Sequence, residues 1–221
     1  MASLRSAARV TRAAQALELG FRCRHNWPMP ECLHTFFPLS PGRAHEAQGS
    51  GAAFFALAAC ANQPKPSLWI NESWQAERLH PAGITPILSP DHLLFANTQN
   101  QADSLAAAEE ALRSAAFSVV VTQLSQPLTL FTGRRLQLAA KAGETTGIFL
   151  IPEGAGSHAA ETRWHCAPHF SPDDSTLHRW KLIKNKSGTL TEWVTRWDEQ
   201  TRGIIVVSEA AERAGAARPP D

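Results

Sequence analysis

The stretch LLFANTQNQADSLAAAEEALRSAAFSVVVT, residues 93–122, decides the predicted fold because it combines two strand patterns with one helix pattern. The short apolar runs Leu93–Asn97 and Ser118–Thr122 are typical of buried strands. Between them, Ser104–Ala116 places apolar residues at helical spacing, and Asp103 stands before this segment as an N-cap. A helix between two buried strands predicts a parallel βαβ unit.

The same alternation continues on both sides of this stretch. Leu68–Asn71 and Gly147–Ile151 are two further predicted strands, and Ala52–Ala61 is a predicted helix. Thr132–Ala142 is another predicted helix, and Gly143 stands at the C′ position that would end it. The predicted fold class is therefore α/β, with a mostly parallel sheet and helices on both faces.

The pattern changes after residue 160, where three predicted strands follow without a helix: Glu161–Ala167, Trp180–Asn185 and Thr191–Trp197. Ser187-Gly188 is a turn signal between the last two strands. These features predict an antiparallel hairpin that extends one edge of the parallel sheet. The later apolar run Ile204–Val207 has two interpretations: a final sheet strand, or a segment that docks on the sheet edge of a partner.

The segments that flank this core differ from it in composition. Residues 1–40 are predicted to form an N-terminal helix and a proline-rich linker arm, residues 41–208 the core, and residues 209–221 a flexible tail. The arm contains two Cys-x-His pairs, formed by Cys23, His25, Cys32 and His34. Their one-residue gaps are shorter than structural zinc sites usually have, so a metal-free loop is favoured and zinc binding stays an open alternative.

Composition excludes several classes of protein. The chain has 221 residues, of which 43% are apolar and 19% charged, as in a globular protein. No apolar run is long enough to span a bilayer, and four scattered cysteines are typical of reduced thiols in a cytoplasmic protein. The net charge is +1 and the middle of the chain is mildly acidic, which argues against a general nucleic-acid binder.

A glycine-containing loop, Gly49-Ser50-Gly51, precedes the helix predicted at Ala52–Ala61, as a phosphate-binding P-loop would. No Lys and no Ser or Thr follow Gly51, and the strand that ends at Thr122-Gln123 offers no acidic ligand for Mg²⁺. We therefore predict a degenerate nucleotide site with no catalytic residue, no metal and no cofactor; a plain tight turn is the alternative.

Two acidic residues, Glu72 and Glu46, have their own interpretations. Glu72 would suit activation of a water molecule, but without a phosphate cradle it has nothing to act on. For His45-Glu46, which leads into the loop, packing at a strand edge is favoured over a general acid–base pair.

Taken in order, these segments resemble the RecA core over roughly residues 40–200, most clearly at KLIKNK, residues 181–186. Within that superfamily the chain resembles the ImuA family. The segments that carry the likeness are GRAHE (42–46), LWINE (68–72), AAEEALRS (107–114), TGRRLQLAAKAG (132–143), TRWHCAP (162–168) and HRWKLIKNK (178–186).

The resemblance implies a bacterial, non-catalytic RecA-like accessory protein of the SOS response. Its expected role is DNA-damage-induced mutagenesis through error-prone translesion synthesis. The implied partners are ImuB, an inactive relative of Y-family polymerases, an error-prone C-family polymerase, and RecA. A RecA-like SulA cell-division inhibitor is an alternative; a nucleotide-dependent motor is disfavoured because the P-loop residues are missing.

A weak single-stranded DNA interface is a further alternative, because cations and tryptophans are interleaved late in the chain. The cations are Arg179, Lys181, Lys184 and Lys186, and the tryptophans are Trp180 and Trp193. A solvated edge strand, with the tryptophans covering the sheet, is the favoured interpretation of the same pattern.

Overall fold

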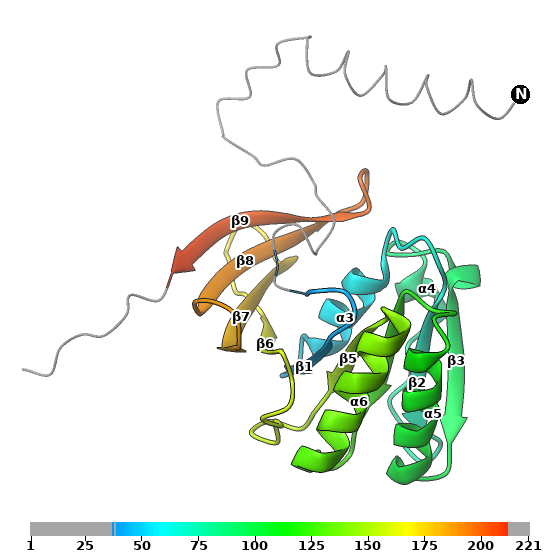
Figure 1. Cartoon of the computed structure of the whole chain (residues 1–221). Coiled ribbons are helices and arrows are strands. Elements are labelled where there is room, and N and C mark those ends of the chain that lie inside the picture. The colour runs from blue at the N-terminus through cyan, green and yellow to red at the C-terminus, as the bar shows by residue number, and fades with distance from the viewer. Residues whose placement is uncertain (1–36, 38, 212–221) are drawn as a thin grey trace, which may run out of the picture.

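The structure is a computed structural model that describes residue 37 and residues 39–211. Nine strands form one sheet in the order β3-β2-β4-β5-β1-β6-β7-β8-β9 (Figure 1). The strands are β1 (Ala44–Gln48), β2 (Ser67–Glu72), β3 (Leu93–Thr98), β4 (Val119–Gln123), β5 (Thr146–Leu150), β6 (Thr162–Pro168), β7 (Leu177–Asn185), β8 (Thr191–Asp198) and β9 (Gly203–Ala211).

The first six strands run parallel, and β7, β8 and β9 continue the sheet antiparallel from β6. Helices α3 (Ala52–Cys60) and α4 (Pro81–Ile84) pack on one face of the sheet. Helices α5 (Gln101–Arg113) and α6 (Leu130–Gly143) lie side by side on the other face (Figure 1). The predicted α/β class, with a mostly parallel sheet and helices on both faces, is confirmed.

Helices α5 and α6 begin earlier than predicted. The Asn100 side chain accepts a hydrogen bond from the backbone N–H of Asp103 at 3.0 Å, so Asn100 is the N-cap of α5. The predicted Asp103 cap is therefore wrong, and Asp103 lies in the first helical turn. Thr129 caps α6 in the same way through the N–H of Thr132, at 3.1 Å.

Gly143 has a different role from the one predicted. It is the last helical residue of α6, and Glu144 takes the left-handed conformation after it, with φ of 52°. A Cβ on Gly143 would lie 1.9 Å from the carbonyl oxygen of Leu112. The glycine is therefore required because α6 ends against the backbone of α5, not because it reverses the chain.

The central strand β1 was not predicted, and the expected strand-edge position of His45 and Glu46 is wrong. All five residues of β1 are buried between β5 and β6. The His45 imidazole pairs with the Thr162 hydroxyl at 2.7 Å and the Ser40 carbonyl oxygen at 3.1 Å. These bonds satisfy a ring that burial would otherwise leave without partners.

Glu46 holds the crossover from β5 to β6, which runs over the sheet without a helix. Its carboxylate accepts hydrogen bonds from the Ser157 N–H and from Arg163 Nε, each at 2.8 Å. Arg163 also donates to the Ser157 carbonyl oxygen at 2.8 Å. A polar strand can therefore be central here because its polar side chains are paired with the loop that covers it.

The C-terminal strands complete the sheet beyond β6. The run Ile204–Val207 lies in β9, where it pairs antiparallel with β8, and Ile204 is buried. No helix among the described residues is long and apolar enough to cross a membrane. Residues 1–36 and 38 of the predicted arm, which include Cys23, His25, Cys32 and His34, and residues 212–221 of the predicted tail lie outside the described residues. The core extends past both predicted boundaries, because Phe37 and Leu39 are buried in it and residues 209–211 belong to β9.

Candidate functional site

The loop predicted as a degenerate nucleotide site connects β1 to α3. The Gly51 N–H donates to the Cys166 carbonyl oxygen at 2.9 Å, and the Ala52 N–H donates to the Gly49 carbonyl oxygen at 3.0 Å. In a P-loop the corresponding N–H groups point at phosphate oxygens. Here these two donors are already bonded within the protein.

The two glycines of this loop are required by packing against β6. Gly49 has φ of +92°, and a Cβ there would lie 2.4 Å from the Cys166 carbonyl oxygen. A Cβ on Gly51 would lie 3.0 Å from the backbone nitrogen of Ala167. The backbone of β6 therefore packs directly against this side of the loop.

Buried polar groups stand at the ends of β2 and β4. Glu72 is 3% exposed and accepts a hydrogen bond from Trp74 Nε1 at 2.8 Å, while its other carboxylate oxygen has no partner among the described residues. The buried Thr122 hydroxyl likewise lacks a partner within that part of the chain. Neither arrangement offers a set of acidic ligands, and no group of three His, Cys, Asp or Glu in residues 37 and 39–211 is placed to hold a metal.

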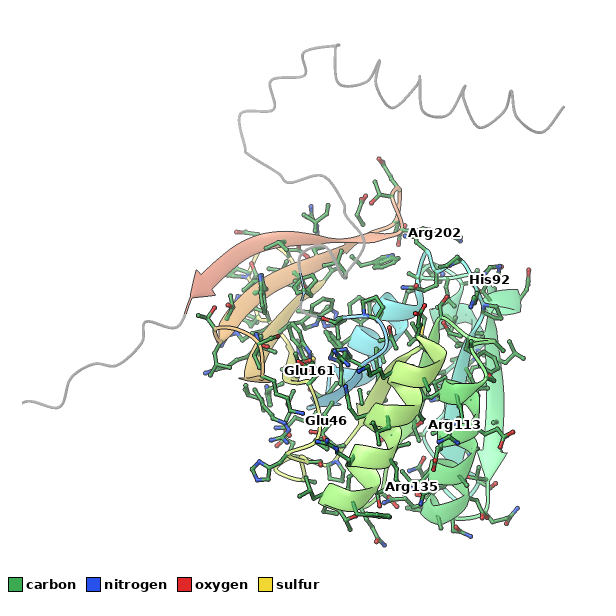
Figure 2. The ribbon with its side chains drawn as sticks, viewed as in Figure 1. Glu46, His92, Arg113, Arg135, Glu161 and Arg202 are labelled. Carbon is green, nitrogen blue, oxygen red and sulfur yellow. The ribbon has the colours of Figure 1, made fainter. Side chains whose placement is uncertain are left out.

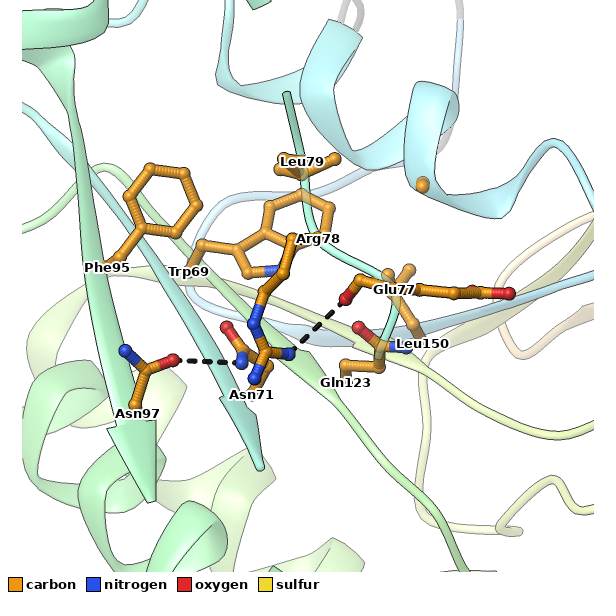
Figure 3. Close-up of a pocket in the computed structure, with 10 residues that line it drawn as sticks. Trp69, Asn71, Glu77, Arg78, Leu79, Phe95, Asn97, Gln123 and Leu150 are labelled. Carbon is orange, nitrogen blue, oxygen red and sulfur yellow. Dashed lines mark hydrogen bonds between the residues drawn. The ribbon is translucent and has the colours of Figure 1, made fainter. Parts of the chain in front are cut away.

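Three carboxamides form a row across neighbouring strands at the carboxyl edge of the sheet. Asn71 on β2 stands in register with Asn97 on β3, and its Nδ2 donates to Asn97 Oδ1 at 3.0 Å (Figure 3). Gln123 ends β4 directly after Thr122, the register partner of Ile70, so it lies on the other side of Asn71. We call Asn97, Asn71 and Gln123 the amide row.

The amide row lines a pocket of about 360 Å³ on the α3 side of the sheet. One layer deeper along the same strands, Trp69 is in register with Phe95, and both rings line the pocket (Figure 3). Leu150 of β5, Ala53 of α3 and the segment 77–79 complete the walls. Carboxyl ends of parallel strands are the usual place for ligands in α/β sheets.

Arg78 fixes the segment that closes the pocket. Its guanidinium donates to the carbonyl oxygens of Ser73 at 2.8 Å and of Glu72 and Glu77 at 3.3 Å. These bonds hold the loop after β2 over the sheet. The guanidinium thus donates to neutral backbone carbonyls and keeps its positive charge, and Glu77 is the acidic residue of the lining.

Two of the four predicted contact cations are used to hold the crossover loop. Lys184 Nζ donates to the carbonyl oxygens of Ser157, His158 and Ala160, at 3.1, 2.9 and 2.6 Å. Lys186 Nζ donates to the Ala159 carbonyl oxygen at 2.6 Å. Burial, with the neighbouring Lys186 charge, lowers the pKa of Lys184.

The other two cations, Arg179 and Lys181, lie on β7. Arg179 pairs with Glu192 at 3.4 Å and with the His169 ring at 2.9 Å, and its side chain is 48% exposed. The tryptophans near them are core residues, since Trp180 is 0% and Trp193 5% exposed. Both pack edge-to-face on Phe37, so these rings cover the sheet and offer no free face to a base.

Comparison of the chain with models of known protein families gives no match, and no curated protein matches its sequence.

Proposed function

We propose that this chain is a non-catalytic RecA-like accessory protein that acts through protein contacts in DNA-damage-induced, error-prone translesion synthesis. The resemblance to the ImuA family implies the partners: an inactive Y-family polymerase relative, an error-prone C-family polymerase, and RecA. The observation that carries a nucleotide-independent role is the loop at Gly49–Gly51, where the Gly51 and Ala52 donors are bonded inside the protein.

The arrangement of the sheet supports the RecA-like part of this proposal. A loop in the position of a P-loop follows the central strand β1 and leads directly into α3. The strand that would carry an acidic Mg²⁺ ligand is β4, which ends at Gln123 beside the pocket. The segments similar to the terminal RecA hairpin form the antiparallel strands β7 and β8.

Helix α6 offers a surface suited to a protein partner. Leu130, Phe131 and Leu138 are 63%, 72% and 56% exposed, which is unusual for large apolar side chains. Arg135 lies 5.9 Å from the Phe131 ring, so a cation accompanies the apolar residues. These residues belong to the segments LTLFTGRRLQL, and part of that stretch carries the family resemblance.

Co-purification with the implied polymerase relative tests the proposal. The full chain should capture it without added nucleotide, and Phe131→Asp with Leu138→Asp should abolish capture while the thermal unfolding temperature stays within a few degrees. Arg113→Ala, on the neighbouring helix, is the matched control that should keep capture. Failure of the unmodified chain to capture this partner, or saturable Mg·ATP binding in calorimetry, would contradict the proposal; capture of the division GTPase instead would favour the SulA-like alternative.

A further inference from the structure

The pocket at the amide row carries hydrogen-bonding groups that the protein itself does not use. The Asn71–Asn97 bond consumes one N–H and one oxygen, which leaves an acceptor on Asn71 and a donor on Asn97. Asn71 Nδ2 also donates to the Glu72 carbonyl oxygen at 3.4 Å, which favours this orientation of the amide. Asn71 is only 3% exposed, so its remaining acceptor is a buried group that faces the pocket.

Gln123 adds a second donor and acceptor beside this pair. Its side chain makes no hydrogen bond to any residue in the described part of the chain, although it is half-buried and lines the pocket. Buried polar groups are usually paired, and a few convergent polar groups in a mostly apolar pocket fix the orientation of a small ligand.

The rings beneath the amide row favour a flat ligand. Trp69 is 3% exposed and forms the inner wall, whereas Phe95 is 49% exposed at the open side of the pocket. An aromatic ring lying against them would place its edge at the amide row, because Trp69 and Asn71 project from the same face of β2. Aromatic stacking on such side chains stabilises bound bases.

Charge decides between a neutral ligand and a phosphorylated one. The Arg78 guanidinium is occupied by three carbonyl oxygens, and the Glu77 side chain is the acidic group among the lining residues. Arg78 is the cation among the lining residues, and because its acceptors are neutral carbonyl oxygens it keeps its positive charge. One cation and one carboxylate residue thus give the lining no net charge, and a single guanidinium beside a carboxylate cannot balance the several negative charges of a triphosphate.

We propose that this pocket binds an uncharged, planar heteroaromatic molecule of the nucleobase or nucleoside class. The carboxamides hydrogen-bond an edge that presents an amino donor beside a ring-nitrogen acceptor, as Asn and Gln do with adenine. The ring lies against Trp69 and Phe95. The site is distinct from the degenerate loop at Gly49–Gly51 and goes beyond the proposed contact role, so either proposal can fail without the other.

Titration calorimetry with the full chain and adenosine as the probe tests this inference. Adenosine should bind with a submillimolar Kd. N6,N6-dimethyladenosine, which lacks the amino donor, should bind about tenfold more weakly, the loss expected for one unmatched polar group. ATP, which adds the charged triphosphate, should show no saturable binding at millimolar concentration. Gln123→Leu and Phe95→Ala should weaken adenosine binding by a similar factor.

Matched controls come from exposed residues of the same types outside the pocket. Gln126→Leu and Phe170→Ala should leave adenosine affinity unchanged, and thermal unfolding should show that all four variants fold. Absence of saturable adenosine binding at millimolar concentration would overturn the inference and leave the amide row as a structural ladder. Equal binding by Gln123→Leu, Phe95→Ala and the unmodified chain would also overturn it, because the nucleoside would then occupy another site.

Discussion

Gly49 lies directly against Cys166: a Cβ built on the glycine would come within 2.4 Å of the Cys166 carbonyl oxygen. This approach brings the loop before α3 onto β6 and allows the Gly51 N–H to reach the same oxygen at 2.9 Å. The Cys166 carbonyl oxygen of β6 therefore accepts the Gly51 N–H of the loop. The same hydrogen bond that stabilises the turn also uses a donor that a P-loop would direct at phosphate.

Replacing Gly49 should destabilise the fold strongly. In Gly49→Ala the Cβ meets backbone atoms, and the residue must keep φ of +92°. The expected loss in the free energy of unfolding is about 2–4 kcal/mol, measured by urea denaturation. Gly154→Ala is the matched control, because Gly154 also has positive φ, +75°, but open space at its Cβ. It should lose only about 1 kcal/mol, and an equal loss in both variants would contradict the packing argument.

The buried pair of Glu46 and Arg163 should contribute more than an exposed one. Glu46 is 1% exposed, so Arg163→Ala leaves a buried carboxylate without its cation, with an expected loss of about 3–5 kcal/mol. The Arg113 side chain, 58% exposed and paired with Glu109, is the comparison (Figure 2). Arg113→Ala should cost about 0.5 kcal/mol. Chemical denaturation of both variants measures the difference, and similar losses would show that burial of Glu46 adds nothing.

Stability should fall on mild acidification because of His45. Burial, together with the nearby Arg43 charge, lowers the pKa of His45 from 6.5 to about 4, against a smaller opposite effect of the Ser40 hydrogen bond. The His45 imidazole therefore takes up a proton near pH 6.5 in the unfolded chain, whereas in the folded protein it stays neutral down to about pH 4. The stability that comes from burying a neutral His45 is complete above pH 6.5. It falls by about 3 kcal/mol as the pH drops from 6.5 to 4.

Comparison with His45→Gln isolates this contribution, since the glutamine does not titrate. The difference in unfolding free energy between the two proteins should narrow as the pH falls from 7.5 to 4.5. A constant difference between His45→Gln and the unmodified chain across this range would contradict the prediction.

The apolar strands were predictable because a βαβ sheet buries them on both faces. Runs such as Leu68–Asn71 and Gly147–Ile151 therefore indicate β2 and β5 without knowledge of their partners. Strand β1 reads AHEAQ and gives no such signal. Its polar residues are paired with groups far along the chain, Glu46 with Arg163 and Gln48 with the Gly154 N–H at 3.3 Å, and local sequence carries no information about such partners.

The amide row was missed although its signal is in the sequence. The predicted strands of β2 and β3 each end with an apolar stretch followed by Asn, and β4 ends at Gln123. Because carboxyl ends of parallel strands share one edge, these amides could have been placed together. The register of these amides could not have been predicted, because it depends on which strands are neighbours in the sheet. The roles of Lys184 and Lys186 were also beyond sequence analysis, because their acceptors are carbonyl groups of a loop 24 to 27 residues earlier.

Of the cations on β7, Lys184 should contribute to the free energy of unfolding, whereas Arg179 should contribute little. Lys184→Gln removes three hydrogen bonds from a charged donor to the crossover loop, so it should lower the unfolding free energy by about 1–2 kcal/mol. Arg179→Gln, at a more exposed position, should change stability by less than about 0.5 kcal/mol. Denaturation at neutral pH checks both values.

If the β7 surface contacts DNA phosphates, Arg179→Gln should weaken single-stranded DNA binding more than Lys184→Gln does. Fluorescence anisotropy with a labelled oligonucleotide should show weak, salt-dependent binding, and Arg179→Gln should reduce the salt slope by about one released counterion. Lys184→Gln should keep the slope of the unmodified chain at temperatures where it is folded, because its ammonium group already serves three carbonyl oxygens. A Lys184→Gln variant of normal stability that loses DNA binding would show instead that Lys184 contacts the nucleic acid and that the loop does not depend on it.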